Sequence, residues 1–241
     1  MMRLLSKKKV PKVTFIFGSP RGGTTFLWSL LESSKGVVPF IKDLSKNTEG
    51  KYKTSESGIY INDEKEASNK IIAFCKMYSN YRIIEKTPSH TLIYKKIIKD
   101  FPKSKNLVIF RHPLAIANSI INSEMDVFRG HTIDSAVQLI KDYYFNLIEL
   151  SRLNNSIVIT YENLLSNTQS VLNDVFKKLE LDSSDLTTIV ESNKGQSKID
   201  VKGVFRKGEA FSFQYELDEC LKEKLNEFLS AEICFYKSLT I

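Results

Sequence analysis

Residues 13–25 read VTFIFGSPRGGTT, an apolar run followed by a loop of glycines and hydroxyl side chains. The run at 13–17 is rich in β-formers and is bounded by Pro11 and Gly18, which is typical of a buried strand. From Thr24 onward leucines recur at helical spacing, so a helix follows the loop. Backbone N–H groups at such a helix N-terminus favour an anion. The stretch therefore predicts a strand, an anion-binding loop and a helix.

The position of the positive charge in this loop is informative. The phosphate loop of nucleotide hydrolases, G-x-x-x-x-G-K-[ST], carries a lysine after its last glycine. Gly18 and Gly23 have that spacing here, but Thr24 stands in place of the lysine. The one cation of the loop is Arg21, inside it. The loop is therefore expected to bind an anion. The missing lysine argues against a P-loop kinase or NTPase.

Strand-like and helix-like segments alternate along the rest of the chain. Short apolar runs predict strands at 81–85, 106–110 and 157–160. Amphipathic spacing predicts helices at 71–78, 92–100, 114–122, 133–153, 168–179 and 217–229. Residues 43–70 are polar and predict an exposed excursion, and the basic, glycine-punctuated residues 192–213 predict an irregular loop. The alternation predicts an α/β fold with a central, mainly parallel sheet flanked by helices.

The composition limits the class of protein. A length of 241 residues suits a single domain, 1–241, and a hydrophobic fraction of 42% allows a sizeable core. The net charge of +7 favours anionic ligands, but the basic residues are dispersed, which argues against a nucleic-acid partner. No apolar run reaches about 18 residues, so no membrane span is expected. The three scattered cysteines favour a reducing, cytoplasmic location.

Ligands of parallel α/β sheets bind where the strands end, so the residues after each strand are candidates. The strand at 81–85 ends in EKTPSH, with a cation at Lys86 and a possible proton acceptor at His90. The three histidines of the chain have no metal-ligand spacing with a cysteine or a carboxylate. We therefore expect no metal site.

The strand at 106–110 is followed by Arg111, where a Mg²⁺-dependent nucleotide hydrolase would carry an aspartate. Ser119 comes about two helical turns later and could bond the same anion. This strand end therefore predicts a second anion rather than a metal.

These segments resemble the motifs of sulfotransferases. GSPRGGTT is similar to the 5′-phosphosulfate loop of the family, P-[RK]-[SG]-G-T-T, although Gly22 stands where serine is common. LVIFRHPLAIANS is similar to the 3′-phosphate motif, R-[DH]-P-x(5)-S, with Arg111 and Ser119 in the defining positions. EKTPSH resembles the E-K-[ST]-P element of carbohydrate-type and many bacterial members. VITYENLL and FRKGEAFSF resemble the later Y-E-[DN]-L and R-K-G elements.

The resemblance covers residues 13–230 and implies the P-loop-NTPase-like sulfotransferase architecture, with 3′-phosphoadenosine-5′-phosphosulfate (PAPS) as co-substrate and no metal. This donor has a phosphosulfate at one end and a lone 3′-phosphate at the other. The residues implied to bind the phosphosulfate are Ser19, Pro20, Arg21, Gly22, Gly23, Thr24 and Thr25. The residues implied to bind the 3′-phosphate and the nucleotide are Arg111, Ser119, Tyr161, Arg206, Lys207 and Gly208.

Sulfuryl transfer needs cations for the leaving phosphate and a base for the acceptor hydroxyl. Arg21 and Lys86 are the expected cations. In heparan-type members the base is a glutamate after the first helix, and the ungapped equivalent here is Asp43. Glu49 and His90 are the alternatives.

The acceptor is the least determined part of the function. The EKTP element favours a carbohydrate or a similar alcohol, so the expected partner is a small molecule or a glycan. Residues 43–70 and 123–132 are expected to shape its pocket. Two other functions stay open: a P-loop kinase or NTPase, and a non-catalytic nucleotide-binding protein of the same fold.

Overall fold

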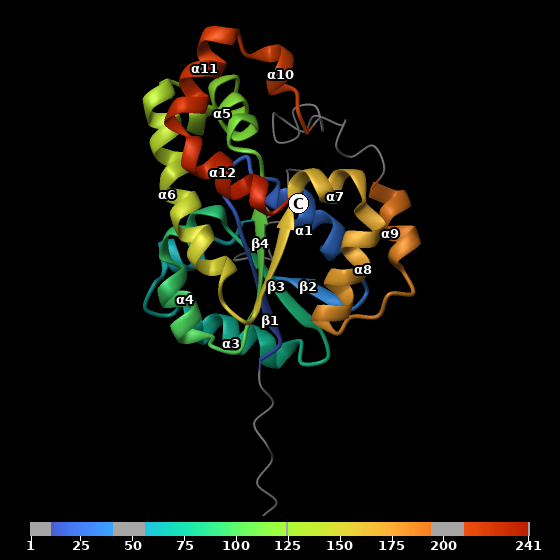
Figure 1. Cartoon of the computed structure of the whole chain (residues 1–241). Coiled ribbons are helices and arrows are strands. Elements are labelled where there is room, and N and C mark those ends of the chain that lie inside the picture. Colours follow the sequence, from blue (N-terminus) through green and yellow to red (C-terminus); the bar gives the residue numbers. More distant parts are fainter. Residues whose placement is uncertain (1–10, 41–55, 124, 194–209, 241) are drawn as a thin grey trace, which may run out of the picture.

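A five-stranded parallel sheet lies at the centre of the molecule (Figure 1). The computed structural model describes residues 11–40, 56–123, 125–193 and 210–240. Within them the strand order is β2-β3-β1-β4-β5. The strands are β1 (Val13–Phe17), β2 (Val37–Pro39), β3 (Arg82–Lys86), β4 (Lys105–Phe110) and β5 (Ser156–Thr160). The predicted α/β fold with a mainly parallel, helix-flanked sheet is confirmed.

The central strand β1 is buried on both faces, which explains why all of its residues except Thr14 are apolar. Successive side chains of a strand point to opposite faces. Accordingly, Val13, Phe15 and Phe17 belong to one apolar cluster, and Ile16 belongs to the other. Two apolar cores therefore lie on the two sides of one sheet.

Helices cover both faces of the sheet (Figure 1). One core includes residues of α2 (Ile59–Asn62), α3 (Ala67–Met77), α4 (Tyr94–Asp100), α5 (Pro113–Ile121), α6 (Ile133–Ser151), α10 (Phe213–Glu216), α11 (Glu219–Phe228) and α12 (Ser230–Ser238). The other core includes residues of α1 (Thr24–Glu32), α7 (Tyr161–Ser166), α8 (Thr168–Leu179) and α9 (Leu186–Asn193). Two 3₁₀ helices, η2 (Pro88–Ile93) and η3 (Asp126–Phe128), complete the described elements. None of the helices in the described ranges has the length and apolar character that a membrane span needs.

All four predicted strands are present, and β2 is an addition. It is three residues long and ends in Pro39, so it has neither the length nor the residue pattern of a predictable strand. It pairs with β3 at the edge of the sheet. The sequence therefore predicted the centre of the sheet and missed one edge.

The predicted exposed excursion at 43–70 is only partly correct over its described residues 56–70, of which Asn62, Glu64 and Lys65 are exposed. Ser57, Ile59 and Tyr60 are buried, and α3 already begins at Ala67. Ser57 donates to Glu85 of β3, and the N–H of Gly58 donates to the Thr87 hydroxyl. The part of the excursion at 43–55 lies outside the described residues.

Candidate active site

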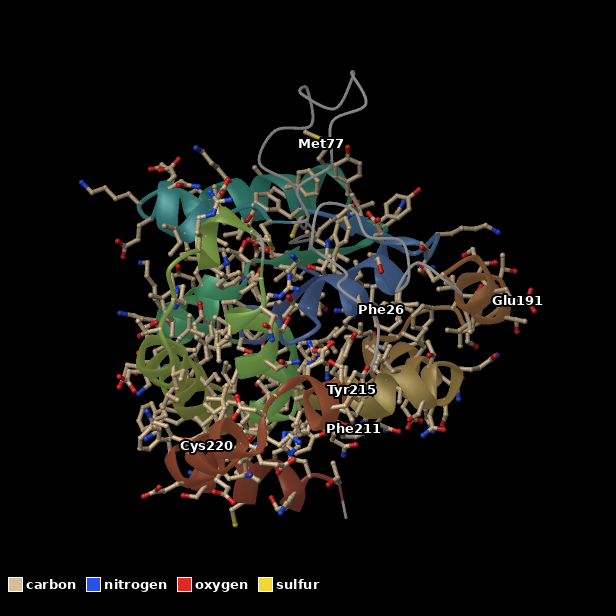
Figure 2. The ribbon with its side chains drawn as sticks, turned by 90° about the horizontal axis from the view of Figure 1, so that it is seen from above. Phe26, Met77, Glu191, Phe211, Tyr215 and Cys220 are labelled. Atoms are coloured by element: carbon tan, nitrogen blue, oxygen red, sulfur yellow. The ribbon has the colours of Figure 1, made fainter. Side chains whose placement is uncertain are left out.

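The residues that end or directly follow β1, β3 and β4 meet at one edge of the sheet, because these strands are parallel neighbours. They are the glycine-rich loop, Lys86 and Arg111. Figure 2 looks down on this edge, with Phe26 and Tyr215 toward the middle of the view and Met77 and Cys220 near its border. The predicted candidates from three separate motifs are thus brought together.

The loop after β1 is a tight turn that depends on small residues. The N–H of Gly22 donates to the carbonyl of Ser19 at 2.9 Å. Arg21 and Gly23 both have left-handed backbones, with φ of 61° and 93°. A Cβ on Gly23 would lie 2.2 Å from the ring of Tyr161, so no side chain fits there. A Cβ on Gly22 would lie 2.8 Å from the Ser19 carbonyl oxygen, so a serine at this position would require the loop to shift.

The start of the loop is bonded to η2. The hydroxyl of Thr91 accepts from the N–H of Gly18 and donates to its carbonyl, both at 3.1 Å. Thr91 is fully buried. The loop position is therefore fixed by the segment that follows β3, and not by β1 alone.

Arg111 lies at the end of β4 and is joined to the loop through Arg21. Its Nη1 donates to the Arg21 carbonyl at 2.9 Å, and its guanidinium lies 4.7 Å from the centre of the Tyr161 ring. Arg21 in turn donates from Nε to the Ser119 hydroxyl at 2.9 Å. Arg21, Arg111 and Ser119 therefore form one cationic group, which is favourable for an anion such as a phosphate.

Lys86 ends β3 on the other side of the loop. Its side chain has no exposed surface, and its Nζ lies 3.2 Å from the Thr25 hydroxyl and 3.1 Å from the Glu56 carboxylate. Burial lowers the pKa of Lys86, and the charge of Glu56 opposes this shift. The ammonium group is thus held against the first turn of α1, where the helix begins.

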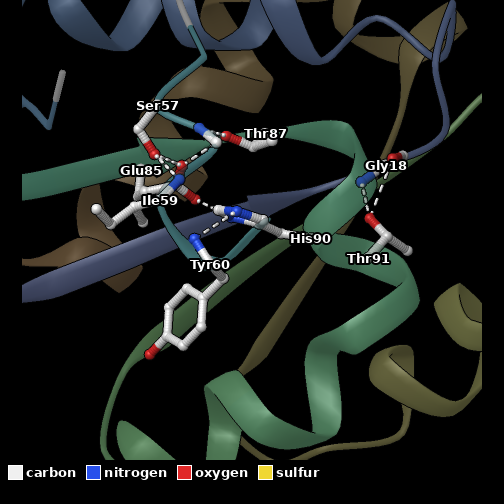
Figure 3. Close-up of polar contacts among 9 residues, drawn as sticks. Gly18, Ser57, Ile59, Tyr60, Glu85, Thr87, His90 and Thr91 are labelled. Carbon is white, nitrogen blue, oxygen red and sulfur yellow. Dashed lines mark hydrogen bonds and ion pairs between the residues drawn. The ribbon is translucent and has the colours of Figure 1, made fainter. Parts of the chain in front are cut away.

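Glu85, the neighbour of Lys86, is the centre of a buried polar network (Figure 3). Its carboxylate accepts hydrogen bonds from Ser57 Oγ at 2.6 Å, Thr87 Oγ1 at 2.8 Å and His90 Nδ1 at 2.9 Å. Burial acts to raise the pKa of Glu85, but the interaction with His90 and the two hydroxyl donors lower it below its ordinary value. The network holds residues 57–60 against the sheet.

His90 is bonded at both ring nitrogens. Nδ1 meets Glu85, and Nε2 accepts from the N–H of Tyr60 at 3.3 Å (Figure 3). The residue is 1% exposed. Both ring nitrogens are thus engaged within the protein, and the role of His90 as an alternative base stays a prediction.

Tyr161 starts α7 directly after β5 and is covered from two sides. Its ring meets Gly23 and Arg111 as described above, and the ring of Phe26 lies edge-on at 6.3 Å between centres. It is 6% exposed. Tyr161 therefore joins the loop to the Arg111 end of the site.

Several candidates lie outside the described residues, namely Asp43, Glu49, Arg206, Lys207 and Gly208. Glu56 is the charged residue near the loop that sequence reasoning missed. It belongs to a polar stretch in which nothing distinguishes it from its neighbours, and its position becomes evident only from its contact with Lys86. Among the described residues, no group of three or more His, Cys, Asp or Glu side chains could hold a metal ion.

The profile of the Sulfotransferase family matches residues 13–185. The chain therefore belongs to the sulfotransferase family, and it is an enzyme of the transferase class. No curated protein sequence matches it.

Solved structures of sulfotransferases share its fold. The sulfotransferase domain of the Synechococcus PCC 7002 olefin synthase is 18% identical, with a TM-score of 0.60 over 93% of this chain and 96% of that chain. The mouse sulfotransferase SULT7A1 complexed with PAP is 16% identical, with a TM-score of 0.62 over 92% and 84%. A sulfotransferase from Alicyclobacillus acidocaldarius is 14% identical, with a TM-score of 0.52 over 95% of both chains.

Proposed function

We propose that this enzyme moves a sulfuryl group from PAPS to a hydroxyl acceptor, and that residues 1–241 form the single domain that performs the transfer. The observation that carries the proposal is the arrangement of cations along one sheet edge. Lys86 lies at one side of the glycine-rich loop, and Arg111 lies at the other. This pattern suits a donor with two separate anionic groups. The fold is also that of a mouse sulfotransferase complexed with PAP.

The donor lies, in this proposal, along the loop. Its 5′-phosphosulfate bonds to the loop residues 19–25, and its 3′-phosphate bonds to Arg111 and Ser119. Tyr161 faces the nucleotide, and Arg206, Lys207 and Gly208, which lie outside the described residues, are further candidates for binding the 3′-phosphate. Arg111 stands where a Mg²⁺-dependent nucleotide hydrolase would carry an aspartate, so binding of the donor does not need Mg²⁺.

The transfer is an in-line displacement. The acceptor oxygen forms a bond to sulfur while the bond between sulfur and the bridging phosphate oxygen breaks. Negative charge develops on the departing 5′-phosphate, and Arg21 and Lys86 stabilise it, as fixed cations do for developing charge. The products are the sulfated acceptor and adenosine 3′,5′-bisphosphate, and the proton of the acceptor hydroxyl passes to a base.

Glu56 is the best-supported base among the described residues. Its carboxylate contacts Lys86, whose ammonium reaches the loop hydroxyl of Thr25, and its side chain is 51% exposed. It is therefore both near the transferred group and open to an acceptor. Asp43 and Glu49 are the alternatives outside the described residues. The EKTP element supports a carbohydrate or a similar alcohol as the acceptor.

Thermal unfolding with added nucleotides tests the donor. A ligand that binds only the folded state at about 100 times its Kd adds about 2.7 kcal/mol of stability. Adenosine 3′,5′-bisphosphate without Mg²⁺ is expected to raise the Tm by several degrees, and ATP with Mg²⁺ is expected to do so far less. A larger shift with ATP and Mg²⁺ would favour a kinase or NTPase. Binding of the bisphosphate without transfer from labelled donor to any acceptor pool would favour a non-catalytic nucleotide-binding protein.

Single substitutions test the base. General-base catalysis contributes about a hundredfold to ten-thousandfold to a rate, so Glu56→Gln is expected to lower kcat by such a factor with little change in bisphosphate affinity. Glu64→Gln is the matched control, because Glu64 also pairs with a lysine, Lys96, at 3.7 Å. Full activity of Glu56→Gln beside an inactive Asp43→Asn or Glu49→Gln would transfer the role to that residue.

A further inference from the structure

The peptide group between Arg111 and His112 is held from both sides. Its carbonyl, which belongs to Arg111, accepts a hydrogen bond from the Tyr144 hydroxyl of α6. Its N–H, which belongs to His112, donates to Glu162 Oε1 of α7 at 3.0 Å. The other carboxylate oxygen of Glu162 accepts from the Tyr236 hydroxyl of α12 at 2.6 Å. Helices α6 and α7 therefore bond this peptide group directly, and α12 is linked to it through Glu162.

These partners are buried. Tyr144, Glu162 and Tyr236 are 0%, 8% and 4% exposed. Burial raises the pKa of Glu162, and the hydrogen bonds from Tyr236 and the His112 N–H act in the opposite direction, as does the charge of Arg111. The folded state is destabilised when a buried polar group loses its hydrogen-bond partner. Each of these hydrogen bonds therefore resists rotation of the peptide group between Arg111 and His112.

The His112 ring connects the C-terminal segment to the same turn. It stacks on Phe213 of α10 with 4.7 Å between ring centres, and it lies 5.2 Å from the Tyr236 ring. Burial lowers the pKa of His112 to about 4, so the ring is neutral at pH 7, and Nδ1 accepts from the N–H of Leu114. Packing and hydrogen bonding therefore hold the turn in one conformation.

We propose that Tyr236 and Glu162, together with Tyr144, are positioning residues for the 3′-phosphate. They fix the peptide plane after Arg111, and thereby the direction in which its guanidinium leaves the backbone. Charge-assisted bonds to a phosphate depend on such geometry. Helix α12, which lies beyond the family match at 13–185, is thus part of donor recognition. This inference rests on the proposed function, because it needs Arg111 to bind the 3′-phosphate.

Tyr236→Phe tests the inference by titration calorimetry with two nucleotides. The variant keeps the ring and removes the bond to Glu162. Binding of adenosine 3′,5′-bisphosphate is expected to weaken about tenfold, while binding of adenosine 5′-monophosphate changes less than about twofold. A loss of general stability would weaken both nucleotides equally, so the ratio of the two affinities separates positioning from folding.

Three further variants complete the test. Tyr94→Phe is the matched control, because it removes a similar bond, from the Tyr94 hydroxyl to Glu149 at 2.7 Å, and both affinities are expected to stay unchanged. Glu162→Gln keeps an oxygen that can accept from the His112 N–H, and it is expected to retain most of the preference for the bisphosphate. If Tyr236→Phe does not fold, Glu162→Ala replaces it, and the same loss of preference is expected.

The outcomes separate this inference from the proposed function. If the wild type prefers the bisphosphate and Tyr236→Phe or Glu162→Ala shows the same preference, the positioning role is wrong and the proposed function is unaffected. If the wild type binds both nucleotides equally, Arg111 does not recognise the 3′-phosphate, and both this assignment and the inference are wrong.

Discussion

The two ends of the proposed donor site each place a buried carboxylate beside a cation, but the two carboxylates differ in their environment. At the Lys86 end, Glu85 accepts from His90 and two hydroxyls, and its pKa is lowered although burial acts to raise it. At the Arg111 end, Glu162 accepts from one hydroxyl and one backbone N–H, and burial raises its pKa. Burial acts to raise the pKa of both carboxylates, and only at Glu85 do the charge of His90 and the hydrogen-bond donors outweigh it.

Glu85 and Glu162 also differ in the backbone segment that each of them fixes through hydrogen bonds. Glu85 fixes residues 57–60, the segment directly after Glu56. Glu162 fixes the backbone of the arginine itself. We therefore expect the Lys86 end to control the chemical step and the Arg111 end to control affinity.

The largest effect is expected for Lys86→Met. Loss of a fixed cation at the developing charge lowers kcat by about a hundredfold to a thousandfold. Adenosine 3′,5′-bisphosphate affinity is expected to fall by a much smaller factor. Steady-state kinetics and calorimetry measure the two quantities, with Lys96→Met as the control for a surface lysine. An effect on affinity as large as that on kcat would contradict the division between the two ends.

Arg111→Ala is expected to show the reverse pattern. A lost charged hydrogen bond costs about 2 to 3 kcal/mol, so the bisphosphate should bind roughly 30-fold more weakly or worse. The affinity for adenosine 5′-monophosphate should change little, since that ligand lacks the 3′-phosphate. Equal weakening of both nucleotides would mean that Arg111 only supports the loop through its bond to the Arg21 carbonyl.

Glu85→Gln tests the network at the Lys86 end by its effect on stability. The amide replaces an ionised acceptor of three donors, so the free energy of unfolding should fall by about 2 kcal/mol at pH 7. A group with a lowered folded pKa contributes stability above its unfolded pKa and loses it as the pH falls through the folded pKa. The difference between wild type and variant in urea unfolding should therefore shrink in acid. A difference that is constant from pH 7 to pH 3 would show that the charge of Glu85 is unimportant.

The sequence predicted the parts of the site whose residues lie close together in the chain. The loop at 18–25 and the pair Arg111 and Ser119 stand out as candidates because their residue types and spacing reflect local needs: small residues for a tight turn, and cations after a strand. The four longer strands were found for a similar reason, since each contains a short run of apolar or β-branched residues.

The missed parts depend on contacts between distant segments. Glu56 reaches Lys86 only because Ser57 and Gly58 bond to Glu85 and Thr87, about 30 residues further on. Tyr236 meets Glu162 across 74 positions, and an amphipathic helix gives no sign of which tyrosine will be buried against a carboxylate. His90 is a candidate base by residue type. Its ring nitrogens contact Glu85 of β3 and the N–H of Tyr60 in α2, and only the contact with Tyr60 joins distant segments.

The smallest and most specific effect is expected for Glu162→Gln. The amide preserves the size of the side chain and can accept from the His112 N–H, so stability at pH 7 should stay within about 1 kcal/mol of wild type. A group with a raised folded pKa contributes stability below its unfolded pKa and loses it as the pH rises through the folded pKa. The variant, which does not titrate, should therefore gain stability relative to wild type as the pH rises from 4 to 8. This slope is opposite to that expected for Glu85→Gln, and urea unfolding across the same pH series measures both. Two slopes of the same sign would show that the pKa values of Glu85 and Glu162 are not shifted in opposite directions.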